Sequence, residues 1–220
     1  MNIEALSAEA LRAFFDHTGR IRMSRELPAI EAGRDDEAAS SLQMLRAIRP
    51  RIESDLLRFY EQYKQRSGDD DHTFSAIELR VTMFQYEIVR EFELLMAHDP
   101  KGFAMAVAAK GLIHRLVEFD RHLRDAVIPE MLKVAESRNA VDFERRTREL
   151  QREVRPGLAV IRRWQGLRNK ATGHYDRDLD VVVELLETVE FEEVLEAAQK
   201  FLLYMAKVLV VLRVSISESK

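Results

Sequence analysis

Cysteine is absent from the 220-residue chain, which excludes disulfide bonds, thiolate zinc sites and cysteine nucleophiles. Glycine and proline are scarce, with 8 and 5 residues, about half of their usual combined share of roughly 12%. So few turn-forming residues indicate long helices rather than the short strands of a β-sandwich. A strong charge of one sign is also missing, since the formal net charge is −4, and this argues against a general nucleic-acid coat.

No long uninterrupted hydrophobic run is present either. The most apolar stretch, 201–214, is interrupted by Lys207 and Arg213 and is shorter than the roughly 20 residues that span a bilayer. It still has little polar surface, so we expect the helix that contains it to be buried nearly all round, in the core or partly in a dimer seam. The first 25 residues include acidic positions and no continuous apolar core, so no signal peptide is predicted. We therefore expect a cytoplasmic protein that makes no membrane contact.

Apolar residues recur at helical spacing through most of the chain. We expect helices over about 7–18, 35–60, 76–97, 100–127, 140–154, 158–167 and 189–214. Pro50 should break or kink the second helix or begin a new one, and Pro156-Gly157 should interrupt the chain. The run 67–71 is predicted to be a loop and Asn139 to be a helix cap. The fold class predicted is all-α, a bundle of six to nine helices counted with the breaks, as a single domain over 1–220.

One predicted helix carries His114, Glu118, His122 and Asp125 on a single face, a pattern that superficially resembles a metal-binding stripe. The two histidines are about 12 Å apart along the helix axis, whereas first-row metals hold their ligands at about 2.1 Å. At most two of the four side chains could therefore share one ion. The alternative is a solvated face with ion pairs between helix neighbours. We expect no metal site and no cofactor.

Four arginines, Arg145, Arg148, Arg152 and Arg155, also share one helix face. Residues 145–170 contain nine basic and two acidic residues, a local net charge of +7, while residues 176–196 have a net charge of −8. The two segments either face each other or are both solvated. In the remaining interpretation the arginines form a phosphate-facing surface, whose binding would depend strongly on salt.

Arg168 and His174 stand in the segment 167–176, whose sequence is LRNKATGHYD. Arginine offers paired donors and a permanent charge that suit a phosphodiester, and histidine exchanges a proton near neutral pH. RNA cleavage by the neighbouring 2′-hydroxyl needs both properties, for charge stabilisation and for proton transfer. On a continuous helix the two side chains would point about 240° apart. If Gly173 ends the helix, His174 can approach Arg168 beyond the last turn.

The string Arg168-Asn169, four further residues and His174 resembles the motif of the HEPN (higher eukaryotes and prokaryotes nucleotide-binding) family. That motif is an arginine, four to six intervening residues and a histidine, and the residue after the arginine is often Asn, Asp or His. The surrounding sequence is similar to that of members encoded near defence and toxin–antitoxin loci. The resemblance covers residues 140–214 best and leaves 1–100 as additional helices of unknown role.

The resemblance implies a helical, usually dimeric, metal-independent endoribonuclease that leaves a 2′,3′-cyclic phosphate. Arg168 would bind the phosphate and stabilise the transition state, and His174 would act as general base or acid. Asn169 and Lys170 are expected to bind the substrate. RNA, a second copy of the chain and a cognate antitoxin protein are the expected partners. Many family members are non-catalytic, so the alternative is a helical RNA- or protein-binding module of a defence or regulatory system.

Overall fold

A computed structural model describes residues 34–140, 142–173 and 178–218, and within these ranges all of the regular secondary structure is helical. The all-α prediction is thereby confirmed. The helix predicted over 7–18 lies outside the described residues. The described elements are α2 (Arg34–Gln65), α3 (Asp69–His98), α4 (Phe103–His122), η1 (Leu123–Val127), α5 (Ile128–Ser137), α6 (Phe143–Arg163), α7 (Gln165–Leu167), η2 (Arg168–Gly173), α8 (Leu179–Glu187) and α9 (Phe191–Glu218), where η denotes a π-helix.

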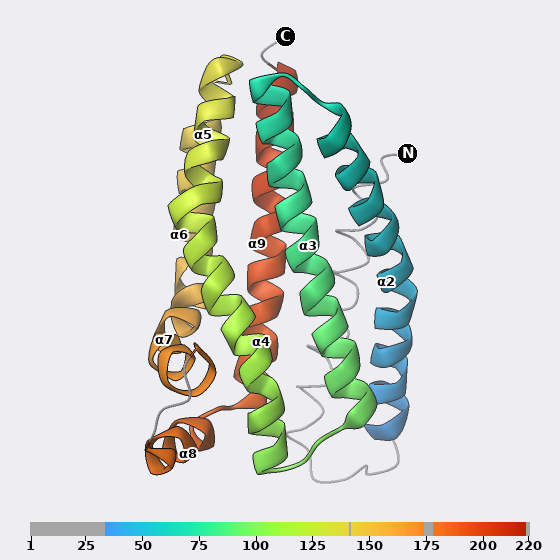
Figure 1. Cartoon of the computed structure of the whole chain (residues 1–220), viewed down its shortest axis with the longest axis vertical. Helices are drawn as coiled ribbons and strands as arrows, with labels where there is room; N and C mark the ends of the chain where they lie inside the picture. Colours follow the sequence, from blue (N-terminus) through green and yellow to red (C-terminus); the bar gives the residue numbers. More distant parts are fainter. Residues whose placement is uncertain (1–33, 141, 174–177, 219–220) are drawn as a thin grey trace.

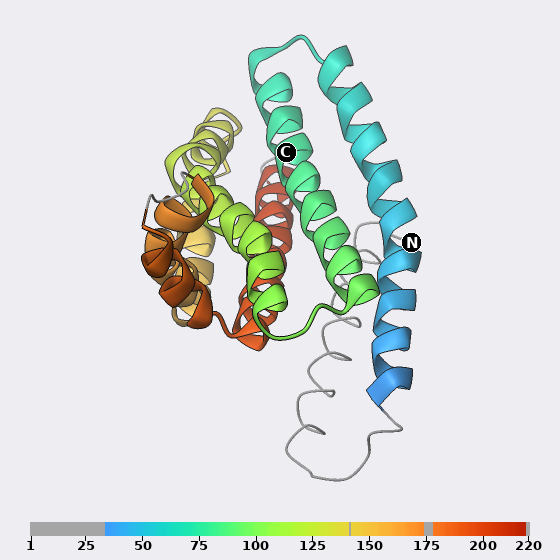
Figure 2. The same ribbon diagram turned by 60° about the horizontal axis from the view of Figure 1, so that its bottom comes forward.

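Long helices run up and down the molecule (Figure 1). The helices α2 and α3 form an antiparallel hairpin, and Figure 2 shows them side by side along one flank. The helix α9 packs against α6, α4 and α3. At one end of the bundle, the short elements α7, η2 and α8 gather against α4 (Figure 1). This arrangement places the segment that contains Arg168 beside a long helix from the first half of the chain.

Three aromatic rings join the central helices. The ring of Phe84 on α3 stacks on that of Phe119 on α4, with 4.0 Å between the ring centroids. Phe201 on α9 meets both rings edge-on, at 5.5 and 6.1 Å. Such pairs add directional stabilisation to the apolar area that they bury. The buried apolar cluster around them extends from α2 to α9, and no helix in the described ranges is long and apolar enough to cross a membrane.

Two prolines lie inside helices: Pro50, where a break, a kink or a new helix was expected, and Pro156, where an interruption was expected. The helix α2 continues through Pro50, and α6 continues through Pro156 as a single helix over residues 143–163. The predicted interruption at Pro156-Gly157 is wrong. A proline removes one hydrogen bond from the preceding turn, and both of these side chains are exposed, so neither ring disturbs the apolar face that holds its helix in the bundle.

Two predicted helix boundaries are also wrong. The helix α3 begins at Asp69, after Gly68, so the predicted loop 67–71 is shorter than expected. Asn139 does not cap α6, because its φ of 57° makes a left-handed turn and the residue before α6 is Asp142.

The helix α9 is buried on one face rather than nearly all round. Its residues Leu203, Val210 and Val214 are 39%, 49% and 40% exposed. Their spacing of seven and four residues places them along one line of the helix. The apolar pattern of α9 therefore supplies both a core face and an exposed apolar stripe, and a dimer seam on this helix stays a prediction.

Candidate functional site

The backbone of Arg168 is anchored by buried neighbours. Trp164 and Leu167 are 8% and 4% exposed, and they tie the end of α6 and the short helix α7 to the core. The amide of Arg168 donates a hydrogen bond to the carbonyl oxygen of Trp164 at 2.8 Å. The π-helix η2 covers Arg168–Gly173 and reaches the limit of this described range, so a helix end at Gly173 stays a prediction.

The guanidinium of Arg168 is held between two side chains. Its Nε lies 2.6 Å from Oε1 of Glu118 on α4, and its Nη1 donates to Oδ1 of Asn169 at 2.9 Å. Gln165 donates to the same Asn169 oxygen at 3.1 Å. The side chain of Arg168 is 23% exposed and that of Glu118 is 38% exposed. The arginine is therefore oriented from two sides but still reaches the surface.

The other motif residues fall into two groups. Asn169 lies beside Arg168 as described, and Lys170 is exposed on the following position of η2. His174 lies outside the described residues, in the gap 174–177, so the structure leaves the approach of His174 to Arg168 untested. The structure thus brings together Arg168 and Asn169 and adds Glu118, which sequence reasoning had assigned to a different pattern.

Sequence reasoning had grouped Glu118 with His114, His122 and Asp125 in a stripe of histidines and carboxylates along α4 and η1. Glu118 contacts Arg168, and Asp125 lies 3.8 Å from Arg121. The ring centroids of His122 and Phe119 are 5.9 Å apart. Among the described residues, no three His, Asp or Glu side chains gather as a metal site would require. The carboxylates of the stripe make ion pairs with arginines.

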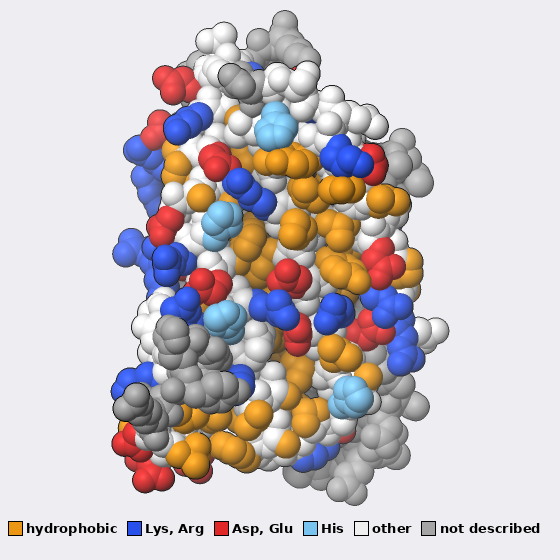
Figure 3. Space-filling model, in the orientation of Figure 1, with side chains coloured by type: hydrophobic (Ala, Val, Ile, Leu, Met, Phe, Trp, Pro, Cys, Tyr) orange, Lys and Arg blue, Asp and Glu red, His pale blue; other side chains and the backbone are white. Residues whose placement is uncertain are grey.

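The four arginines of the predicted stripe all lie on the exposed side of α6. Arg145 and Arg148 make ion pairs with acidic neighbours of their own helix end: Arg145 with Asp142 and Glu149, and Arg148 with Glu144. The hydrogen bonds to Glu149 and Asp142 raise the pKa of Arg145. By contrast, Arg152 and Arg155 make no ion pair with any described residue. Figure 3 shows Lys and Arg side chains along the edge of the molecule beside α6.

These ion pairs bear on the charge imbalance between residues 145–170 and 176–196. Within the described ranges, Arg163 on α6 and Glu193 on α9 form an ion pair that joins the two segments. The carboxylates that neutralise the stripe belong mainly to α6 itself. The interpretation in which the two segments neutralise each other therefore accounts for Arg163 and not for the stripe.

A cavity of about 360 Å³ opens beside the stripe. Its lining comes from α4, η1, α6 and α9 and consists of Asp120, Leu123, Arg124, Arg148, Gln151, Arg152, Val154, Arg155, Leu158, Arg162 and Tyr204. Asp120 is 4% exposed, and its Oδ2 lies 3.1 Å from Nε of Arg124 and 3.9 Å from Nε of Arg162. Sequence reasoning placed Arg148, Arg152 and Arg155 on one face. It left out Arg162, which lies seven residues after Arg155 on the same helix, and Arg124, which lies on η1 and is brought close only by packing.

Burial raises the pKa of Tyr204, which lines this cavity from α9, above its ordinary value of about 10. The nearby charge of Asp120 acts in the same direction. A hydrogen bond with Gln151 and the charge of Arg162 act in the opposite direction without cancelling the effect. The phenol is therefore protonated at neutral pH and can donate a hydrogen bond.

No family model, curated protein or solved structure matches the chain. The resemblance to the HEPN motif therefore stands on the residues 167–176 and on their position between two helices. The functional evidence in the molecule itself is the arrangement of Arg168, Asn169 and Glu118 and the chemistry of His174.

Proposed function

We propose that the protein is a metal-independent endoribonuclease in which Arg168 and His174 act on the scissile phosphate. The observation that carries the proposal is the fixed guanidinium of Arg168, which Glu118 and Asn169 orient at the surface six residues before the histidine. An arginine held in one orientation loses little freedom when it binds a phosphate.

In the proposed reaction the 2′-hydroxyl of one nucleotide attacks the adjacent phosphorus. The O2′–P bond forms, the P–O5′ bond breaks, and the products are a 2′,3′-cyclic phosphate and a 5′-hydroxyl. His174 takes the proton of the 2′-hydroxyl or gives a proton to the departing 5′-oxygen. Arg168 stabilises the negative charge that develops on the phosphoryl oxygens, and Asn169 and Lys170 bind the neighbouring phosphates.

The proposed assembly is a homodimer with one cleft formed by the two motifs. The exposed apolar stripe of Leu203, Val210 and Val214 on α9 offers a surface that a second copy could cover. A protein antitoxin is a further partner in this proposal, because a free ribonuclease of this kind damages the cell that makes it. Size measurement of the purified chain by light scattering tests the dimer independently of the chemistry.

The second candidate function is binding of RNA or protein without turnover. It is favoured by the 2.6 Å contact between Arg168 and Glu118, because that carboxylate offsets the positive charge that catalysis would use. In this case the pair fastens η2 to α4, and His174 has no chemical role. The two candidates differ in what happens to RNA when the histidine is replaced.

The deciding experiment is cleavage of end-labelled single-stranded RNA in EDTA by the wild type, Arg168→Ala and His174→Ala. Matched controls are Arg90→Ala and His98→Ala, since both of these side chains are exposed on α3. We expect either motif variant to lose at least about 100-fold in rate, with both controls active and products that end in 2′,3′-cyclic phosphate. Full activity of His174→Ala contradicts the catalytic assignment, and binding with no cleavage across varied RNAs favours the second candidate.

A further inference from the structure

The arginine-lined cavity beside α6 lies apart from the proposed ribonuclease site. Glu118, which contacts Arg168, and Asp120, which lines the cavity, are two residues apart on α4 and therefore about 200° apart around its axis. We propose that this cavity binds a small molecule that carries two or three adjoining phosphate groups. The proposal does not depend on RNA cleavage.

The charge of the cavity is the first argument. Five arginines line it, one from η1 and four from α6: Arg124, Arg148, Arg152, Arg155 and Arg162. Two carboxylates offset them, because the lining residue Asp120 pairs with Arg124 and Arg162 and the neighbouring Glu144 pairs with Arg148. Three positive charges therefore remain to be compensated, which a diphosphate or triphosphate group would do. The planar fork of arginine is the side chain best matched to phosphate oxygens.

The orientation of the arginines is the second argument. Asp120 is almost fully buried, and it holds Arg124 and Arg162 from inside the protein. Removing a carboxylate from water is costly, and two ion pairs repay that cost only when the geometry is kept. Asp120 thus prearranges two guanidinium groups at the mouth of the cavity, which lowers the entropy that a ligand must remove.

The shape of the cavity is the third argument. A volume of about 360 Å³ lies within the usual range of small-molecule sites, roughly 300–1,000 Å³. Leu123, Val154 and Leu158 supply apolar surface, and the buried Tyr204 supplies a hydroxyl donor. Apolar surface beside a ring of cations suits a ligand with an organic part and a phosphate tail, such as a nucleoside diphosphate.

The charges along α6 favour this compact ligand over an RNA strand. A strand needs positive charge along several successive phosphates. Towards the start of α6, however, Asp142 and Glu149 neutralise Arg145, and an adjoining hollow of about 280 Å³ is lined in part by Glu144 and Glu149. Arg152 and Arg155, which pair with no carboxylate in the described part of the chain, both line the cavity.

The test is titration calorimetry of the full chain at about 0.15 M salt with pyrophosphate, tripolyphosphate, ADP and a single-stranded RNA oligonucleotide as separate probes. The informative variant is Arg152→Ala/Arg155→Ala, which removes two exposed charges and should leave the fold intact. The control is Arg90→Ala/Arg163→Ala, which removes two exposed arginines from outside the cavity. Far-UV circular dichroism and the melting temperature check that both variants are folded.

We expect tripolyphosphate or ADP to bind the wild type and to lose at least about tenfold in affinity in the cavity variant. The control should remain within about twofold, because neither of its arginines lines the cavity and exposed charges are screened at this salt concentration. Tighter binding of ADP than of pyrophosphate identifies a nucleotide as the source of the phosphates, and equal binding identifies free polyphosphate. Absence of binding by all three small probes overturns the proposal, and so does equal affinity in the wild type and the cavity variant. An effect of the cavity variant on RNA binding alone assigns the cavity to a nucleic acid instead.

Discussion

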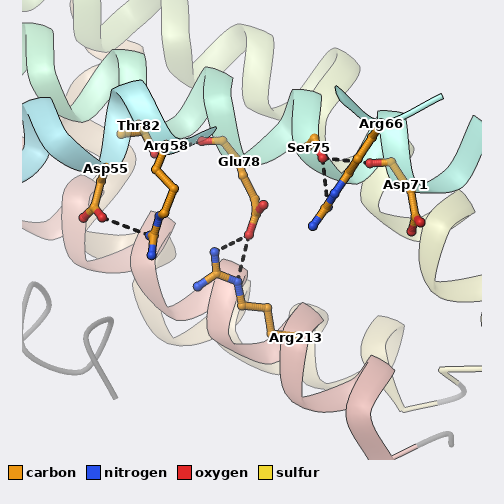
Figure 4. A network of polar contacts seen from close by, with 8 residues as sticks. All are labelled: Asp55, Arg58, Arg66, Asp71, Ser75, Glu78, Thr82 and Arg213. Carbon is orange, nitrogen blue, oxygen red and sulfur yellow. Dashed lines mark hydrogen bonds and ion pairs between the residues drawn. The ribbon is translucent and has the colours of Figure 1, made fainter. Parts of the chain in front are cut away.

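Removal of Arg213 should destabilise the protein strongly, because this residue compensates a carboxylate in the interior. Arg213 on α9 binds Glu78 on α3, with its Nε donating to Oε1 at 3.1 Å and its Nη2 contacting the same oxygen (Figure 4). The side chain of Glu78 is 5% exposed, whereas that of Arg213 is 22% exposed. The guanidinium also lies 5.9 Å from the ring centroid of Phe59 on α2. One side chain thus links three helices.

The magnitude follows from the difference in exposure between the two partners. Breaking a buried ion pair by deleting one member costs about 3–5 kcal/mol, since the other charge is left uncompensated. Arg213 is partly hydrated in the native state, so we expect Arg213→Ala to cost about 3 kcal/mol, at the lower end of that range. For a chain of this size, that loss lowers the melting temperature by roughly 6–12 °C.

Urea unfolding followed by far-UV circular dichroism measures this free energy. The matched variant is Glu78→Gln/Arg213→Ala, which also removes the charge of the buried carboxylate, and we expect it to regain at least about half of the lost stability. A loss below about 1 kcal/mol in Arg213→Ala, which is typical of an exposed pair, would refute the reasoning. So would a double variant as unstable as the single one, because the cost would then lie in packing rather than in an uncompensated charge.

Two further predictions concern pH and helix propensity. Tyr204 has a raised pKa in the folded protein, so its contribution to stability is complete below about pH 10 and is lost as the pH rises through the raised value. Tyr204→Phe should therefore lose less unfolding free energy than the wild type between about pH 9 and pH 11, and equal losses would contradict this assignment. Gly111 lies inside α4, and a Cβ added there would meet no atom within 4 Å. Gly111→Ala should raise the unfolding free energy by about 0.5–1 kcal/mol in the same urea assay, and a destabilised variant would show that the helix needs the glycine.

The helical fold could be predicted from the sequence because it depends on local periodicity and on the scarcity of turn-forming residues. The breaks could not, because tertiary packing decides whether a proline ends a helix. At Pro50 and Pro156 the exposed ring costs one hydrogen bond, while the buried residues on either side hold the helix in place. At Asn139 the side chain is a good cap, but the backbone adopts a left-handed turn instead.

In the candidate site, too, the local features could be predicted from the sequence and the long-range contacts could not. Arg168 and Asn169 could be singled out from the sequence, since their chemistry and their spacing from His174 are local. The role of Glu118 could not, because it depends on the packing of α4 against η2, and the sequence grouped this residue with helix neighbours on a face expected to be solvated. The cavity is a still longer-range feature. Its arginines come from η1 and α6, and the buried Asp120 that orients two of them carries no signal in its local sequence.

The π-helix η1 joins α4 to α5 and sets the angle, about the common helix axis, between the buried face of α4 and that of α5. A π-helical turn closes its hydrogen bonds over five residues instead of four, so it takes up one residue more than an α-helical turn. Buried positions lie before η1, up to Asp120, and after it, from Met131 onward. The spacing of the second set along the sequence is therefore shifted by this one extra residue relative to the first set. Deleting one residue from Leu123–Val127 would let this segment become a uniform α-helix in which both halves keep their buried faces, whereas the full sequence wound entirely as α-helix would turn one half about 100° against the other. The five residues Leu123–Val127 thus set how the buried faces of α4 and α5 align, and they also include Arg124, which lines the cavity.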